Sequence, residues 1–97
     1  MIKLHKKDGR TVVAVCDSDL AGRKFTEGER QLDLSSDFYR GEEKDDLEAG
    51  DLIRNADIVC LAGPKSIELG RQEGVVDENS IQTVEGIPHV QAVIITE

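Results

Sequence analysis

Aromatic side chains are scarce in this chain. Phe25, Phe38 and Tyr39 are the only three among 97 residues, and tryptophan is absent. The hydrophobic core must therefore be built from Val, Ile, Leu and Ala. Proteins that bind single-stranded nucleic acid without sequence preference stack bases on aromatic rings, so the sequence offers almost no platform for that kind of binding.

Long hydrophobic runs are also missing. The longest uninterrupted apolar runs, residues 12–16 and 58–62, fall far short of the roughly 20 residues that a membrane-spanning helix requires. The basic start of the chain lacks the apolar stretch and the small-residue cleavage site of a secretory signal peptide. We therefore expect a cytoplasmic protein that has no membrane partner.

Cysteine and histidine occur only twice each. Cys16 and Cys60 lie inside apolar runs, which is typical of small buried side chains in a reducing compartment, and we expect no disulfide. No Cys-x-x-Cys or His-x-x-x-His motif joins them to His5 or His89, so we expect no metal site. Because no acid, base and nucleophile converge in the pattern, we expect no catalytic residues and no cofactor.

Charge is unevenly distributed along the chain. The formal net charge is −8, which disfavours indiscriminate binding to nucleic acid. Residues 1–30, however, contain seven Lys or Arg and five Asp or Glu, so this part is +2 and the rest is −10. The candidate nucleic-acid-binding patch consists of Lys3, Lys6, Lys7 and Arg10. The alternative is that these are solvated charges at a hairpin tip that offset neighbouring acids.

The length and composition fit a single domain over residues 1–97. Residues 2–6 alternate apolar and polar side chains, Asp8-Gly9 follows, and residues 11–16 are β-branched, which predicts an antiparallel hairpin. A short turn should follow at residues 17–22, capped by the side chain of Asp17 or Ser18.

The middle of the chain predicts a strand and a loop, followed by two helices with a buried strand between them. Residues 30–34 alternate apolar and polar side chains, which predicts a third, half-exposed strand. Residues 35–44 predict a loop, and we expect its Phe38 and Tyr39 side chains to be tucked under it. Residues 45–56 place apolar side chains at i, i+3, i+4 and i+7 with acids in the first turn, which predicts a helix. A buried strand at residues 57–62 and a second helix at residues 64–73 complete this part.

The end of the chain returns to strand patterns. We expect an edge strand at residues 81–84, a turn at 86–88 and a long terminal strand at 89–96 that lies inside the sheet. Strands at both ends with two helices between them predict an α+β fold. Its architecture is a two-layer sandwich in which two helices cover one side of a mixed β-sheet.

Residues 63–66 form the candidate anion or ligand site. Gly63 suits the N-cap and Pro64 the first helical position, while Lys65 and Ser66 add a charge and a hydroxyl beside N–H groups that we expect to face outward and hold phosphate or sulfate. The spacing excludes a nucleotide-hydrolysing P-loop. The alternative is ordinary helix initiation with an exposed lysine.

Two further sets of polar residues are candidates. His89 and Gln91 should lie on one face of the terminal strand, where they can hydrogen bond to a ligand. The acidic residues 42–46 suit either a solvated helix start or a docking surface for a basic partner.

Several stretches of the sequence resemble an archaeal family known as domain of unknown function 424. They include Ala56-Asp57-Ile58, Gly63-Pro-Lys-Ser66 and Gly86-Ile-Pro-His-Val-Gln91, and the similarity extends over essentially the whole chain. The resemblance implies a small cytoplasmic archaeal protein, with a link to RNA or translation. It assigns no catalytic residues.

Three functions are consistent with these patterns. The leading hypothesis is a non-catalytic binding module for RNA or a ribonucleoprotein partner, which uses residues 63–66 and His89 with help from the basic hairpin. One alternative is a small enzyme or sensor that binds a phosphorylated metabolite at residues 63–66. Another is a protein-binding subunit that acts through its acidic face. The sequence leaves the oligomeric state open.

Overall fold

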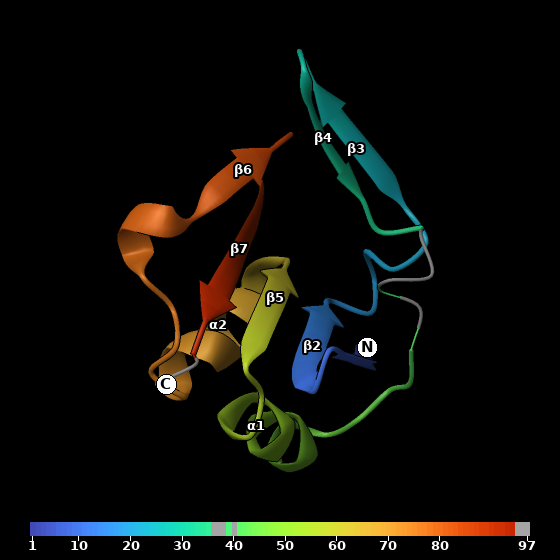
Figure 1. Ribbon diagram of the computed structural model, residues 1–97. Helices are drawn as coiled ribbons and strands as arrows, with labels where there is room; N and C mark the ends of the chain where they lie inside the picture. Colours follow the sequence, from blue (N-terminus) through green and yellow to red (C-terminus); the bar gives the residue numbers. More distant parts are fainter. Residues whose placement is uncertain (36–38, 40, 95–97) are drawn as a thin grey trace.

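The main sheet of the protein has five strands (Figure 1). The computed structural model describes residues 1–35, 39 and 41–94. Across the sheet the order is β1 (Ile2–Lys7), β2 (Arg10–Cys16), β5 (Ile58–Ala62), β7 (Ile87–Val93) and β6 (Gln82–Val84). Strands β2 and β5 are parallel and every other pair is antiparallel, so the sheet is mixed as predicted.

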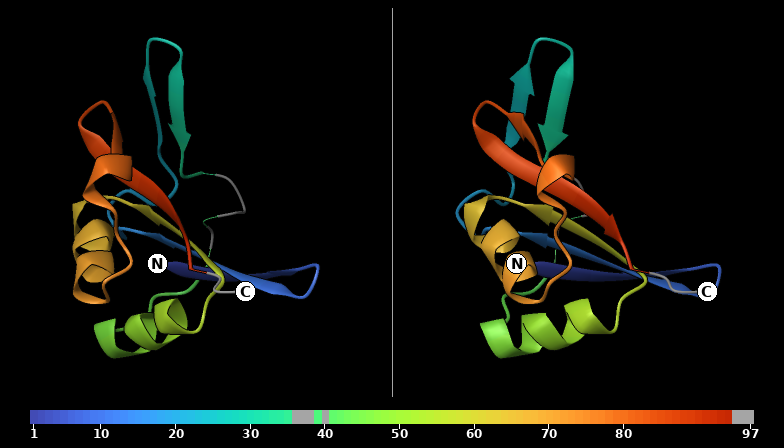
Figure 2. Two further views of the ribbon diagram at one scale, coloured as in Figure 1. Left: turned by 60° about the vertical axis from the view of Figure 1, so that its left-hand side comes forward. Right: turned by 90° about the vertical axis from the view of Figure 1, so that its left-hand side faces the viewer.

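Two helices cover one face of this sheet (Figure 2). Helix α1 spans Asp46–Arg54 and helix α2 spans Pro64–Gln72, which confirms both predicted helices. Helix α1 begins where the carboxylate of Asp45 accepts a hydrogen bond from the N–H of Glu48 at 2.8 Å. The α+β fold with helices on one side of a mixed sheet is therefore confirmed.

The main core lies between the helices and the sheet. Alternate strand residues point toward the helices, and the buried set unites Val13, Val15, Val59, Leu61 and Val90 of the strands with Ala49, Ile53 and Ile67 of the helices. Among the described residues, this core contains no aromatic ring. None of the described helices is long and apolar enough to cross a membrane.

The predicted hairpin at the start of the chain is confirmed. Strands β1 and β2 pair from Ile2 opposite Val15 to Lys7 opposite Arg10. Asp8 and Gly9 form the two-residue turn, both with positive φ, which suits the twist of the two strands. The hairpin extends beyond the rest of the sheet (Figure 2).

A second hairpin covers part of the other face of the sheet. The strand predicted at residues 30–34 exists as β4 (Arg30–Asp33), but it pairs with β3 (Lys24–Glu27), which the sequence did not reveal, in a separate two-stranded sheet. Phe25 and Leu32 of this hairpin pack on Cys16, Ala62 and Val84 of the main sheet. The protein therefore has a second, smaller core.

The end of the chain differs from its prediction in one place. Gln82–Val84 is the edge strand β6, as expected, but the turn lies at Glu85 and Gly86 rather than at residues 86–88. Both turn residues have positive φ, so Ile87 and Pro88 already belong to β7. Strand β7 lies between β5 and β6, which confirms its interior place. Phe38 and the last residues of the predicted strand lie outside the described residues.

Candidate nucleic-acid interface

The N-terminus of helix α2 is occupied by a side chain of the protein itself. The carboxylate of Asp17 accepts hydrogen bonds from the N–H groups of Lys65 at 3.1 Å and Ser66 at 2.7 Å, and from the Ser66 hydroxyl at 2.9 Å. Asp17 is only 5% exposed. The prediction that these N–H groups face outward is therefore wrong, because an internal carboxylate takes the place of the expected phosphate.

Asp17 was also expected to cap the turn that follows β2. Its side chain instead reaches α2, while its backbone carbonyl accepts a hydrogen bond from the N–H of Leu20 at 3.0 Å. The hydroxyl of Ser18 donates to the carboxylate of Glu43 at 2.6 Å. Both side chains therefore connect distant segments of the chain, and neither caps the local turn.

The side chain of Lys65 lines a cleft beside α2. Asp46, Glu68 and Leu69 line the same cleft, whose volume is about 380 Å³. One ammonium group thus shares the cleft with two carboxylates. Lys65 and Ser66 also line a second cleft of about 150 Å³, which contains Lys44 together with Asp17 and Asp46. Such mixtures of charges do not by themselves select an anion.

His89 and Gln91 lie on the opposite side of the sheet. His89 pairs with Ala62 and Gln91 with Cys60, so both side chains are on the face away from the helices, as their alternation predicts for one shared face. The sheet therefore separates them from Lys65. The N–H of Gly63 donates to the carbonyl of Pro88 at 2.8 Å, so the backbones are adjacent, but the side chains of Lys65 and His89 do not share one site.

The basic hairpin contributes to the same face as His89. In the register of β1 and β2, Lys3 is opposite Ala14, His5 is opposite Val12, and Lys7 is opposite Arg10, and all of these positions are on the face away from the helices. Lys6 is opposite Thr11 and belongs to the helical side. The predicted set of four cations is therefore divided between the two faces.

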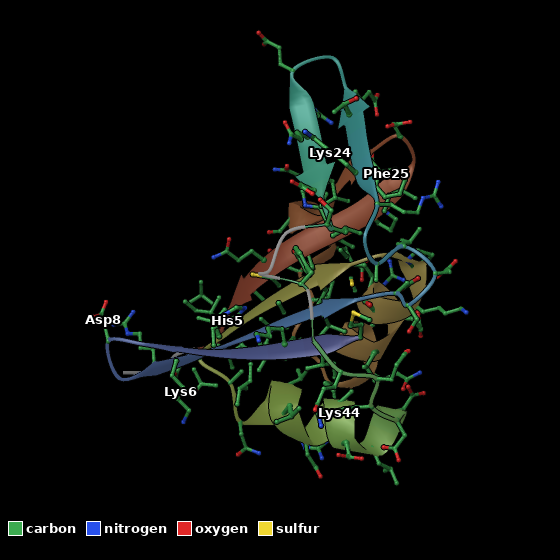
Figure 3. All side chains as sticks on the ribbon, turned by 90° about the vertical axis from the view of Figure 1, so that its right-hand side faces the viewer. His5, Lys6, Asp8, Lys24, Phe25 and Lys44 are labelled. Atoms are coloured by element: carbon green, nitrogen blue, oxygen red, sulfur yellow. The ribbon has the colours of Figure 1, made fainter. Side chains whose placement is uncertain are left out.

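We call this surface the helix-free face. It is defined by the residues Lys3, His5, Arg10, Val12, Ile58, His89, Gln91 and Val93. Figure 3 shows His5 and Lys6 along the β1–β2 hairpin, Lys24 and Phe25 on the second hairpin, and Lys44 at α1 on the other side of the sheet.

The strands of the main sheet contain no acidic residue. All 20 Asp and Glu residues of the chain lie outside β1, β2, β5, β6 and β7. Among the described residues, no carboxylate forms an ion pair with Lys3 or Arg10. The nearest acid in sequence, Asp8, is at the hairpin tip and lines a depression of about 430 Å³ with Arg10, Val12 and Ile58.

Three cations on the helical side, unlike Lys3 and Arg10, form ion pairs with acids. Arg54 is paired with Glu73 at 2.6 Å and Arg71 with Glu78 at 2.7 Å. Lys44 lies 3.2 Å from Glu42. Acids thus neutralise these three cations, whereas Lys65 of α2, like Lys3 and Arg10 on the helix-free face, has no ion-pair partner among the described residues.

The second hairpin adds a cation that the sequence pattern did not connect with His89. The guanidinium of Arg30 donates to the carbonyl of Thr83 at 3.3 Å, which holds it beside the start of β7. Partial burial lowers the pKa of His89, and the positive charge of Arg30 lowers it further. Arg30 carried no local signal for this role, because the position of its hairpin depends on contacts with β6.

Neither thiol has the properties of a nucleophile. Cys16 is buried and Cys60 partly buried, and both are free. Burial raises the pKa of each thiol, which disfavours the reactive thiolate. Among the described residues, no three His, Cys, Asp or Glu side chains are grouped as metal ligands.

The fold and this face define a small α+β domain with a basic, carboxylate-free sheet. The chain belongs to the family described as proteins of unknown function, DUF424, whose model matches residues 5–95. It is also similar to a solved structure, an uncharacterized conserved protein from Methanopyrus kandleri. The two share 27% sequence identity with a TM-score of 0.79, over 99% of this chain and 91% of the other. No curated protein matches the chain.

Proposed function

We propose that this chain is a non-catalytic, cytoplasmic binding module for RNA, alone or within a ribonucleoprotein, and that it binds through the helix-free face. The observation that supports this most is the contrast between cations. Lys3 and Arg10 have no ion-pair partner among the described residues, whereas Arg54 and Arg71 are paired with acids. Unpaired cations on a carboxylate-free sheet suit phosphate groups, which supply most sequence-independent affinity for nucleic acid.

The segregation of charge would allow an acidic protein to bind RNA. The net charge of −8 repels polyanions at long range, but screening at about 0.1 M salt limits this repulsion to roughly 10 Å. The strands of the main sheet have no acids, which lie instead in the helices, the loops and the second hairpin, where Glu27 and Asp33 belong to β3 and β4. An RNA on the helix-free face would therefore meet cations at short range.

A phosphorylated metabolite at residues 63–66 is the second candidate. Its support is weaker, because Asp17 already accepts hydrogen bonds from the N–H groups of Lys65 and Ser66. A protein partner on the acidic helical side is the third candidate, and one observation favours it. Leu47, in the acidic helix α1, is 81% exposed.

Fluorescence anisotropy with a labelled RNA tests the proposal. We expect binding to the wild-type chain that weakens steeply with salt, because phosphate contacts release counterions. Arg10→Glu should weaken binding at least about tenfold, while Lys65→Glu, the same charge reversal at α2, should leave it nearly unchanged. Loss of binding in Lys65→Glu alone would favour the helix terminus instead. No binding even at low salt would refute the proposal.

A further inference from the structure

Positive groups lie at both ends of the helix-free face. Arg10 begins β2, and six residues later Cys16 ends it beside Ala62, which is opposite His89. At about 3.3 Å per residue, these ends are about 20 Å apart along the strand direction. Arg30 supplies the cation at the His89 end, where it is opposite Glu27 across the second hairpin.

The middle of the face is uncharged. Val12 and Ile58 are partly buried there, and Val93 is 67% exposed. The amide of Gln91 and the imidazole of His89 supply hydrogen-bonding groups close by. Toward His89, Cys16 and Ala62 are buried beneath the second hairpin. One cationic end, Arg10, therefore lies on the sheet, and the other, Arg30, is carried by the second hairpin.

The described part of this surface offers no fully exposed aromatic ring for base stacking. Phe25 is 7% exposed and packs in the second core, and Tyr39 is partly buried against that core. Burial is the main reason that the pKa of the Tyr39 phenol is raised. A flexible single strand would have to be held extended between the two cationic ends without the stacking that normally offsets its loss of freedom.

A double helix meets these constraints without that cost. The two strands of a double helix hold their phosphates at fixed positions. A pair of cationic ends can therefore contact these phosphates with little loss of conformational freedom. Proteins recognise double-stranded RNA mostly by shape, through phosphates and 2′-hydroxyls. His89 and Gln91 provide donors and acceptors that suit 2′-hydroxyls.

We infer that the helix-free face binds the backbone of double-helical RNA in preference to single-stranded RNA. This inference rests on the proposed function and specifies its ligand. Contacts to the backbone carry no sequence information, so duplexes of different sequence should bind alike.

The test compares the full chain bound to a duplex of about 16 base pairs with the chain bound to an unstructured single strand of the same length. At about 0.1 M salt, we expect the duplex to bind at least about tenfold more tightly. Equal or tighter binding of the single strand would overturn the inference and leave the proposed function intact. Failure of both RNAs to bind would refute the proposed function as well.

Two variants test the role of the separated ends. Arg10→Gln and Arg30→Gln each remove one cationic end, and each should reduce the preference for the duplex by several-fold. Arg71→Gln removes the same charge from the helical layer and should leave the preference unchanged. If Arg71→Gln reduces the preference as much as the other two, net charge rather than the spacing of the ends is responsible, and the inference fails.

Discussion

The carboxylate of Asp17 accepts hydrogen bonds from both the N–H and the hydroxyl of Ser66, at 2.7 and 2.9 Å. These residues are 49 positions apart, and their contact joins the end of β2 to the start of α2. It satisfies N–H groups that every helix start leaves without an intrahelical partner. Residues 63–66 look most like an anion site in the sequence. Their hydrogen bonds to Asp17 instead have a structural role, because they hold the start of α2 against the end of β2.

Asp17→Ala should destabilise the protein by about 2–4 kcal/mol, because it leaves the buried N–H and hydroxyl of Ser66 without an acceptor. Urea unfolding measures the change as a lower midpoint at unchanged slope. Asp19→Ala is the matched control, since Asp19 is exposed two residues away, and it should change stability by no more than about 0.5 kcal/mol. Similar losses in both variants would contradict the structural role of Asp17.

Gly63→Ala should be more damaging than Gly86→Ala. Both glycines have positive φ, but an added Cβ at Gly63 would lie 2.5 Å from Cγ of Asp17, whereas the one at Gly86 would meet nothing within 4 Å. We expect about 1 kcal/mol of backbone strain for either variant and a further 1–3 kcal/mol at Gly63 for the displaced Asp17. Thermal unfolding of the two variants provides the comparison, and equal stabilities would show that the contact with Asp17 is unimportant.

Stability should depend on pH through His89. Partial burial and then Arg30 lower the pKa of His89 below its ordinary value of 6.5. Below that pH the unfolded chain binds a proton that the folded chain resists, so stability falls as the pH decreases from about 7 toward the folded pKa. His89→Gln should lose less stability than the wild type between about pH 7 and pH 5.

The cause of this shift has its own test. Arg30→Gln removes the nearby charge and should raise the pKa of His89 in an NMR titration of the imidazole. An unchanged titration would show that burial alone is responsible.

Much of the fold is predictable because its signals are local. The first hairpin follows from Asp8-Gly9 between an alternating and a β-branched segment, and α1 follows from its apolar spacing and its acidic first turn. Strand β3 escaped prediction because Phe25 is its only apolar residue. Its position depends on hydrogen bonds to the turn after β6, including one from the N–H of Thr26 to Glu85 at 2.6 Å.

The candidate site was less predictable for the same reason. The sequence identified His89, Gln91 and the basic hairpin separately, but the register across β1, β2, β5 and β7 decides which of them share a face. That register assigns Lys6 to the helical side and Arg10 to the helix-free face. It also separates His89 from Lys65, which the sequence had grouped together.

Lys6 and Arg10 form a matched pair for testing this division. They are close together on one hairpin but on opposite faces. Arg10→Glu should weaken RNA binding about equally across sequences and flatten its salt dependence by roughly one unit of slope per lost phosphate contact. Lys6→Glu should have the smaller effect on both. The reverse order would place the RNA on the helical side of the hairpin.

The most direct test of the account is to map the bound RNA on the protein by NMR. Titration of the isotope-labelled chain with an RNA duplex should shift the amide signals of His5, Arg10 and Gln91, and leave those of Lys65 and Ser66 in place. Shifts confined to the start of α2 or to the acidic helix α1, or no shifts at low salt, would contradict binding through the helix-free face.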